Sequence, residues 1–190
     1  MKRDIILCGV GGQGILSIAT VISEAATAAG LQLKQAEVHG MSQRGGSVVT
    51  YVRFGDKVYS PVITAGEADY IVSFEKLEAA RYADCLKEGG TVIVNTQEIA
   101  PMPVIVGATA YPSDILSEMT AKGIHVDAMD ALSLAETAGS SKAVNIVLMG
   151  RLAKYFDIPK DKWIAAIEKS VAEKFVEMNK KAFELGYSAE

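Results

Sequence analysis

The chain has 190 residues, of which 49% are hydrophobic and 22% are charged, and this composition is that of an ordinary globular protein rather than a disordered one. Its length fits one domain, so we expect residues 1–190 to form a single domain. The net charge is -4 and no dense basic run precedes the C-terminal helices, which argues against nucleic-acid binding.

The chain has two cysteines, Cys8 and Cys85, which limit the redox chemistry that it can carry out and indicate its compartment. They form no C-x-x-C pair and cannot supply the four thiolates that an iron–sulfur cluster usually takes. We expect two reduced thiols in a cytoplasmic protein. Asp127 and Asp130 lack a matching ligand set, so no metal site is expected. No uninterrupted apolar run is long enough to span a membrane, and we expect no membrane partner.

The predicted elements alternate between strands and helices before a run of helices closes the chain. Residues 4–9 form a buried strand, and an alanine-rich helix over residues 15–29 ends at Gly30. Gly-Asp at residues 55–56 lies between two β-rich segments and predicts a hairpin over residues 47–60. Further strands are expected at 31–38, 69–74, 91–95, 104–106 and 124–128, and further helices at 75–86, 113–121, 131–138, 143–156, 160–172 and 174–185.

This order predicts an α/β fold, with a Rossmann-like, doubly wound, mostly parallel sheet covered by helices on both faces. The hairpin at residues 47–60 adds antiparallel edge strands to it. The C-terminal helices pack across one face or form an arm toward a partner. Asn145, a polar residue within an apolar helix, is hydrogen-bonded inside the fold or faces that partner.

A Gly-rich turn with the pattern G-x-G-x-x-G joins the first strand to the first helix. The first glycine permits a tight turn, the second permits a ligand to approach the backbone, and the third lets the helix pack on the strand. Free N–H groups at the start of the helix suit a phosphate or a carboxylate, and a glutamine within the turn could add its amide. The candidate binding residues are Gly9, Gly11, Gly12, Gln13 and Gly14.

Two interpretations of this turn stay open. In a dinucleotide site, an acidic residue at the end of the second strand holds a ribose, and Glu37 stands at about that position. Alternatively, the glycines serve only the close packing of a strand and a helix.

The loop over residues 39–46 follows the second strand and combines glycines with hydrogen-bond donors. In a doubly wound sheet it leaves the sheet beside the Gly-rich turn, where ligands collect. Arg44 offers a forked guanidinium for a carboxylate or a phosphate, and Ser42 and Gln43 add further polar groups. His39 could relay protons near neutral pH, so His39 and Arg44 are the candidate catalytic residues. The alternative is a surface loop in which both residues are structural.

A resemblance to a known family rests on two motifs together, which are residues 9–14 (Gly-Val-Gly-Gly-Gln-Gly) and residues 37–46 (Glu-Val-His-Gly-Met-Ser-Gln-Arg-Gly-Gly). Together they resemble the gamma domain of the 2-oxoacid:ferredoxin oxidoreductases, and most of all the beta subunits of the indolepyruvate enzymes. The resemblance continues through residues 69–75 and 143–150 and covers most of the chain.

The resemblance implies an enzyme that oxidatively decarboxylates an aryl 2-oxoacid such as indolepyruvate, transfers the acyl group to coenzyme A and passes electrons to ferredoxin. In this family thiamine diphosphate and the iron–sulfur clusters belong to the large subunit. This chain is therefore expected to bind no cofactor tightly and to be inactive alone. The resemblance also places Gly11, Gly12, Gln13 and the segment Ser42-Gln43-Arg44 at the subunit junction, where they shape the active site and the approach of coenzyme A.

Other functions remain compatible with the residues alone. The chain could be a stand-alone NAD- or FAD-binding module, or a non-catalytic scaffold whose loop only docks to a large subunit. Whether the chain forms a homodimer is also left open by the sequence. The anion that meets the turn could be a coenzyme A phosphate, the thiamine pyrophosphate or the substrate carboxylate.

Overall fold

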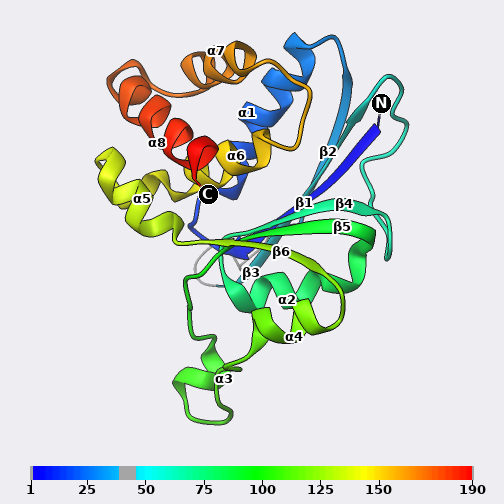
Figure 1. Cartoon of the computed structure of the whole chain (residues 1–190), viewed down its shortest axis with the longest axis vertical. Coiled ribbons are helices and arrows are strands. Elements are labelled where there is room, and N and C mark those ends of the chain that lie inside the picture. Colours follow the sequence, from blue (N-terminus) through cyan, green and yellow to red (C-terminus); the bar gives the residue numbers. More distant parts are fainter. Residues whose placement is uncertain (1, 39–45, 190) are drawn as a thin grey trace.

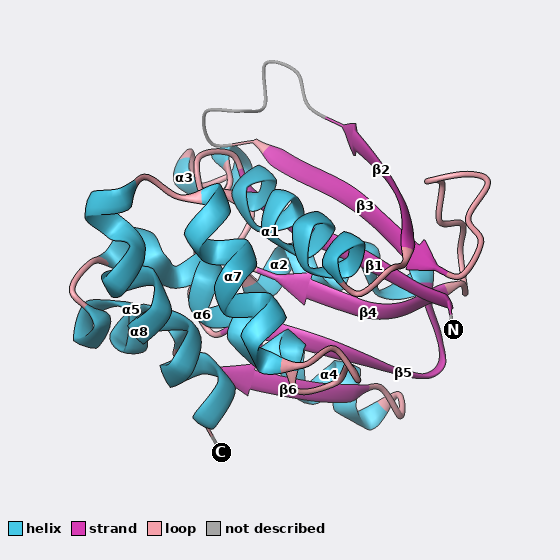
Figure 2. Ribbon diagram, turned by 90° about the horizontal axis from the view of Figure 1, so that it is seen from above, coloured by secondary structure: helices cyan, strands magenta, loops and turns pink. Residues whose placement is uncertain are grey.

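The computed structural model describes residues 2–38 and 46–189. Within them, one mixed sheet has the strand order β2-β3-β1-β4-β5-β6 (Figure 2). Four strands, β1, β4, β5 and β6, run parallel, and β3 runs antiparallel to both of its neighbours. The strands are β1 (Lys2–Val10), β2 (Gln32–Val38), β3 (Ser47–Gly55), β4 (Ala68–Ser73), β5 (Leu86–Asn95) and β6 (His125–Met129).

Helices cover both faces of the sheet, as the alternating pattern predicts (Figure 1). One face packs against α1, α5, α6, α7 and α8, and the other packs against α2 and α4. The helices are α1 (Ile15–Ala28), α2 (Lys76–Tyr82), α3 (Met102–Ile105), α4 (Ile115–Ala121), α5 (Ala131–Ala138), α6 (Val144–Ala153), α7 (Lys160–Ser170) and α8 (Val176–Ser188), with short 3-10 turns at Ala83–Cys85, Ser141–Ala143 and Glu173–Phe175. No helix among the described residues is long and apolar enough to cross a membrane.

Strand β1 is buried on both faces, which confirms the prediction from its continuous apolar run. Ile5 and Leu7 point into the core beneath α1 and α6, whereas Ile6 and Cys8 point into the core beneath α2 and α4. Side chains alternate between the faces of a strand, so a strand in the centre of the sheet is apolar at every position.

The predicted hairpin over residues 47–60 is wrong in its second strand. Residues 57–60 form no strand, and β3 instead pairs with β2 on one side and β1 on the other. The antiparallel hairpin is therefore β2 with β3. Arg53 of β3 lies directly opposite Asp4 of β1, and its Nε and Nη2 atoms donate to the two carboxylate oxygens at 2.6 and 3.0 Å. This buried, bidentate ion pair fixes the register of β3 against β1.

Two shorter segments also differ from the sequence prediction. Residues 104–106 are not a strand, because Pro101 and Pro103 begin the single helical turn α3, a position that suits the fixed φ of proline. Gly89 and Gly90 do not end a helix. They lie inside β5, where the register against β4 shifts and Gly89 has a φ of 73°, as expected for glycine in a β-bulge.

Helices α6 and α8 pack with their backbones in close approach. A Cβ atom on Gly150 would lie 2.2 Å from the carbonyl oxygen of Phe183, and one on Gly186 would lie 1.9 Å from the carbonyl oxygen of Val147. No side-chain movement relieves such a contact, because both neighbours are backbone atoms. The two glycines therefore set the distance between these helices.

We predict that Gly186→Ala destabilises the chain. In an isolated helix, Gly to Ala would stabilise by about 1 kcal/mol, but here the overpacking of α6 against α8 outweighs that gain, at a cost of about 1–3 kcal/mol or more. The free energy of unfolding, measured by chemical denaturation, checks the sign. Glu177→Ala, at an exposed position of α8, is the control and should change stability by less than about 0.5 kcal/mol. A Gly186→Ala variant more stable than the wild type would contradict the packing.

Candidate functional site

The Gly-rich turn lies at the carboxyl edge of the sheet, between β1 and β4. These two strands are parallel neighbours, but α1 leaves β1 toward one face and α2 leaves β4 toward the other. Such a divergence is the switch point of a doubly wound sheet, where a crevice opens and ligands bind. The structure therefore places the turn where the sequence predicts a site.

The side chain of Gln13 bridges the two diverging strands. Its Oε1 atom accepts a hydrogen bond from the backbone N–H of Val10 at 2.7 Å, and its Nε2 atom donates to the carbonyl oxygen of Phe74 at 3.3 Å. A Cβ atom on Gly9 would lie 2.7 Å from the same Oε1 atom and 2.9 Å from the Cβ of Phe74. Gly9 is thus required by this bridge. Both ends of the Gln13 amide are engaged inside the fold.

Asn145 holds the other side of the turn. Its Nδ2 atom donates to the carbonyl oxygen of Gly14 at 3.3 Å, which links the start of α6 to the start of α1. Gly14 has a φ of 80°, and a Cβ atom there would lie 2.8 Å from Nδ2. Asn145 is buried, with 8% exposure. Of the two roles predicted for Asn145, the structure shows the hydrogen bond within the fold.

Between these two supports, only some of the backbone N–H groups of the turn have an acceptor among the described residues. The N–H of Gly11 donates to Gly46 at 2.8 Å, and that of Gln13 donates to Val10 at 3.2 Å. No acceptor within residues 2–38 and 46–189 takes the N–H groups of the remaining turn residues and the first helical positions, which are Gly12, Gly14, Ile15 and Leu16.

Helix α1 has no side-chain cap and no acidic residue in its first turn. The positive end of its dipole is therefore unopposed by residues of its own helix. The hollow over this end has a volume of about 340 Å³ and is lined by residues 10–17 and Val48. Backbone donors at such a helix end suit a phosphate or a carboxylate.

A larger hollow, of about 770 Å³, continues from the turn along the carboxyl edge. Its lining combines Gly12, Gly14 and Ser17 with Gln97 and residues of α5 and α6. The residues of α5 and α6 are Leu132, Glu136, Val144 and Asn145. Glu136 is the anionic side chain of the described lining, Lys142 is the cationic one, and Gln13, Ile99 and Ser141 complete it.

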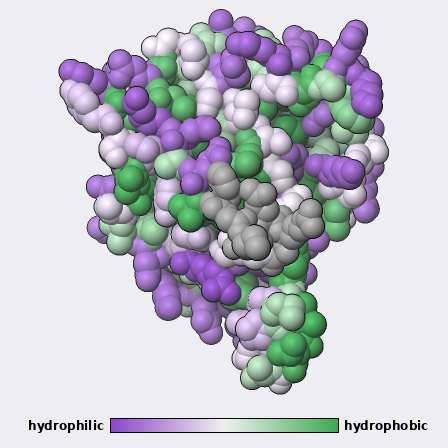
Figure 3. Space-filling view, turned by 180° about the vertical axis from the view of Figure 1, so that it is seen from behind, coloured by the Kyte–Doolittle hydropathy of each residue, from purple (hydrophilic) through white to green (hydrophobic). Residues whose placement is uncertain are grey.

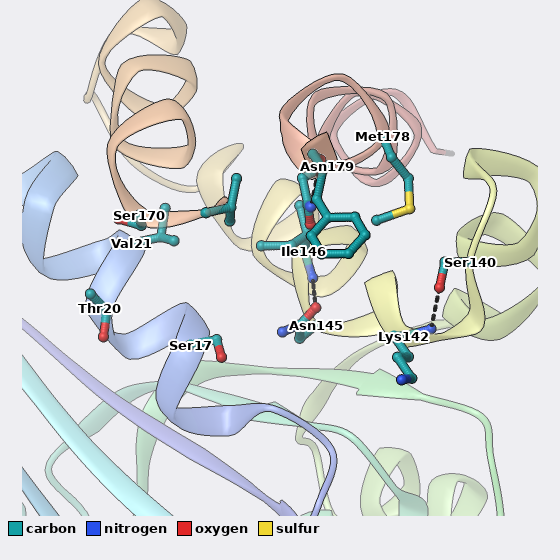
Figure 4. A pocket seen from close by; sticks show the side chains of 12 residues that line it. Ser17, Thr20, Val21, Ser140, Lys142, Asn145, Ile146, Ser170, Met178 and Asn179 are labelled. Atoms are coloured by element: carbon teal, nitrogen blue, oxygen red, sulfur yellow. Dashed lines mark hydrogen bonds between the residues drawn. The ribbon is translucent and has the colours of Figure 1, made fainter. Parts of the chain in front are cut away.

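A third hollow, of about 350 Å³, lies between α1, α6 and the segment that joins α7 to α8. Figure 4 shows Ser17 on α1, and across the hollow from it Asn145 on α6 and Lys142 in the 3-10 turn that precedes α6. These three residues also line the larger hollow. Residues at the start of α6 thus line two of these hollows, and within the described part of the chain only Ser17 lines all three.

The candidates on the second strand and its loop have different outcomes. His39, Ser42, Gln43 and Arg44 lie outside the described residues. The end of their loop meets the turn, since Gly46 accepts the hydrogen bond from Gly11.

Glu37 lies on β2, which β3 separates from β1. Two strand spacings are about 10 Å. In a dinucleotide site, the acidic residue follows the strand next to β1, so the topology does not support that role for Glu37.

Two buried polar residues at this edge were not singled out from the sequence. Asn95, at the end of β5, donates to the carbonyl oxygen of Phe74 at 3.2 Å and accepts from the N–H of Ala131 at 3.1 Å. Glu75, just after β4, accepts from the N–H groups of Glu78 and Ile99 and from the hydroxyl of Tyr111. Burial, and then this bond to Glu75, raise the pKa of Tyr111. The sequence signal that could have identified Asn95 and Glu75 is their position at the end of a buried strand or shortly after one.

The cysteines do not fit an iron–sulfur cluster. Cys8 is fully buried, and this burial raises the pKa of its thiol to about 12. Burial also raises the pKa of Cys85, which lies after α2. A cluster needs thiolates, and among the described residues no three potential metal ligands come together.

Comparison with known proteins gives a consistent match over the whole chain. Residues 4–189 match the pyruvate ferredoxin/flavodoxin oxidoreductase family. Indolepyruvate oxidoreductase subunit IorB of Thermococcus kodakarensis is 43% identical over 99% of this chain and 96% of its own length. The protein of that name from Archaeoglobus fulgidus is 41% identical over 99% and 95%.

Solved structures agree with the fold. The gamma subunit of a keto/oxoacid ferredoxin oxidoreductase from Geobacter sulfurreducens superposes with a TM-score of 0.72 at 25% identity, covering 97% of this chain and 96% of that chain. A 2-oxoglutarate:ferredoxin oxidoreductase from Magnetococcus marinus has a TM-score of 0.77 at 21% identity, but this chain covers only 30% of it. From these matches and the geometry above, the chain belongs to the pyruvate ferredoxin/flavodoxin oxidoreductase family.

Proposed function

We propose that this chain, as one gamma-type domain over residues 1–190, is the small subunit of an indolepyruvate-type 2-oxoacid:ferredoxin oxidoreductase. Two relatives more than 40% identical over nearly the whole chain carry the name of an indolepyruvate oxidoreductase subunit, which supports this substrate class. Both cysteines are free thiols, which supports a cytoplasmic location. The enzyme would oxidise an aryl 2-oxoacid to an acyl-coenzyme A and reduce ferredoxin.

The chain's own residues would contribute binding and positioning, and the partner would contribute the redox groups. The large subunit would hold the thiamine diphosphate, which supplies the carbanion chemistry, and the iron–sulfur clusters. In this chain the thiol of Cys8 is buried with a raised pKa, so its donor set supports no cluster of its own. Electrons would reach ferredoxin through the complex.

The observation that carries the proposal is the set of N–H groups at the start of α1 that have no acceptor within residues 2–38 and 46–189. Gln13 and Asn145 hold the turn from two sides, so its donors are in place before a ligand arrives. Donors fixed in advance bind an anion at lower entropic cost. We propose that they receive a phosphate or a carboxylate at the subunit junction. Ser42, Gln43 and Arg44 would complete the site from the neighbouring loop, with His39 as a further candidate.

We predict that the purified chain alone has no oxidoreductase activity. Co-expression with a large subunit that carries thiamine and iron–sulfur motifs should give coenzyme A-dependent reduction of ferredoxin by indolepyruvate. The assay follows ferredoxin reduction, with pyruvate and 2-oxoglutarate as competing substrates. Full activity of the isolated chain, or a clear preference for 2-oxoglutarate, would refute the proposal.

A second prediction uses opposite effects on stability and binding. Ser17 lines the hollow over the start of α1 and lies in the first turn of this helix. In Ser17→Glu, the new carboxylate should stabilise the chain by about 0.3–1 kcal/mol, because it faces the positive helix end. The same charge should compete with the anion and raise the KM for coenzyme A or for the oxoacid on the order of tenfold, about 1.4 kcal/mol.

The matched control is Ser17→Gln, which has nearly the same size without the charge. It should leave both KM values within about twofold of the wild type, a difference well under 1.4 kcal/mol. Which KM rises in Ser17→Glu identifies the anion. If the glutamate variant is as active as the glutamine variant with both substrates, no anion meets this turn, and the chain acts there as a scaffold.

A further inference from the structure

A projecting apolar arm over residues 96–113 is not used by the site described above. Figure 1 shows α3 standing away from the rest of the molecule, and Figure 3 shows apolar side chains gathered on that projection. Met102, Ile105 and Val106 are 66%, 65% and 66% exposed. Single exposed apolar residues are ordinary on a protein surface, but a projecting cluster of three marks an interaction site.

The projecting part of the arm, residues 99–113, is also uncharged. Residues 99–113 include no Asp, Glu, Lys, Arg or His, whereas the acidic residues Glu98 and Asp114 stand at its two ends. Anionic lipid headgroups attract basic clusters, so this pattern does not fit a membrane surface. An uncharged apolar projection fits an apolar recess of another protein.

The arm has a defined shape before any partner binds. The N–H groups of Ile105 and Val106 donate to the carbonyl oxygens of Pro101 and Met102 at 3.1 and 3.0 Å. Pro103 accepts two further backbone hydrogen bonds, from residues 108 and 109.

Glu75 fixes the two ends of the arm at its base, because it accepts from the N–H of Ile99 and from the hydroxyl of Tyr111. A shape fixed in this way lowers the entropic cost of docking.

The base of the arm is continuous with the candidate site. Gln97 and Ile99 line the hollow of about 770 Å³ together with Gly12 and Gly14. A protein that covers the Gly-rich turn therefore also reaches the start of the arm.

From this continuity we infer that the arm is a docking element for the large, thiamine-bearing subunit, and that Met102, Ile105 and Val106 insert into an apolar recess of that subunit. The inference rests on the proposed function, since it names the same partner.

The test compares a double variant of the arm with matched controls in the complex of full-length subunits. Ile105→Glu with Val106→Glu places two charges on the arm, and we expect the Kd for the recombinant large subunit to rise at least tenfold. Ile105→Leu with Val106→Ile keeps the arm apolar and should bind like the wild type. Val62→Glu charges an exposed valine outside the arm, at 54% exposure, and should also bind normally.

Thermal unfolding of each variant checks the fold, and we expect unchanged Tm values because the substituted side chains are exposed. An unchanged Kd for the charged double variant would overturn the inference. Self-association of the wild-type chain that the same variant abolishes would assign the arm to a second copy and would also overturn it. If the wild-type chain does not bind the large subunit at all, the proposed function fails as well, so the two failures are distinguishable.

Discussion

The side-chain amide of Gln13 solves a problem that arises wherever two parallel strands diverge. Beyond the last ladder bonds of β1 and β4, the N–H of Val10 and the carbonyl of Phe74 lose their strand partners, and buried backbone groups without partners are costly. One glutamine satisfies the N–H of Val10 at 2.7 Å and, together with Asn95, the carbonyl of Phe74, to which it donates at 3.3 Å, and so ties the two strand ends together. The bridge is sterically possible only because Gly9 has no side chain. The conformation of the whole turn, and hence the position of α1, depends on this amide.

This bridge also explains which groups of the turn are available for function. The side chain of Gln13, which the sequence suggests as a ligand group, makes its hydrogen bonds inside the fold. Asn145 likewise donates to the carbonyl oxygen of Gly14. The donors of the turn that have no acceptor among the described residues are therefore backbone N–H groups, which carry no side-chain specificity and whose direction is fixed by the helix. A site of this kind recognises negative charge and position rather than the identity of a molecule. Discrimination between 2-oxoacids would then come from side chains outside the turn, including those of a partner.

Local patterns in the sequence predicted the local structure, and long-range pairing accounts for the errors. The buried strand, the glycine turn and α1 follow from apolar runs and glycine spacing over a few residues. The position of β3 between β2 and β1 does not follow from such local patterns, because it depends on the pairing of Arg53 with Asp4, which is far away in the sequence. The internal role of Gln13 depends on Phe74, which directly follows β4, a strand that only the folded topology brings alongside β1. The short helix α3 was mistaken for a strand because its β-branched residues outweighed the signal of its two prolines. His39 and Arg44, which carried much of the sequence argument, lie outside the described residues.

In the proposed complex, the polar turn and the apolar arm would depend on each other. An anion held by backbone donors at an open surface competes with water and is weakly bound, whereas the same donors act far more strongly once water is excluded. The hollow beside Gly12 and Gly14 is open in the chain alone, and Gln97 and Ile99 on its wall lead directly into the arm. Apolar docking of the arm would supply non-directional affinity and would bring a second protein over the hollow, which raises the strength of each N–H contact with the anion. The arm would thus provide the binding energy and the turn the orientation, so that the anion is held firmly only when both subunits are assembled.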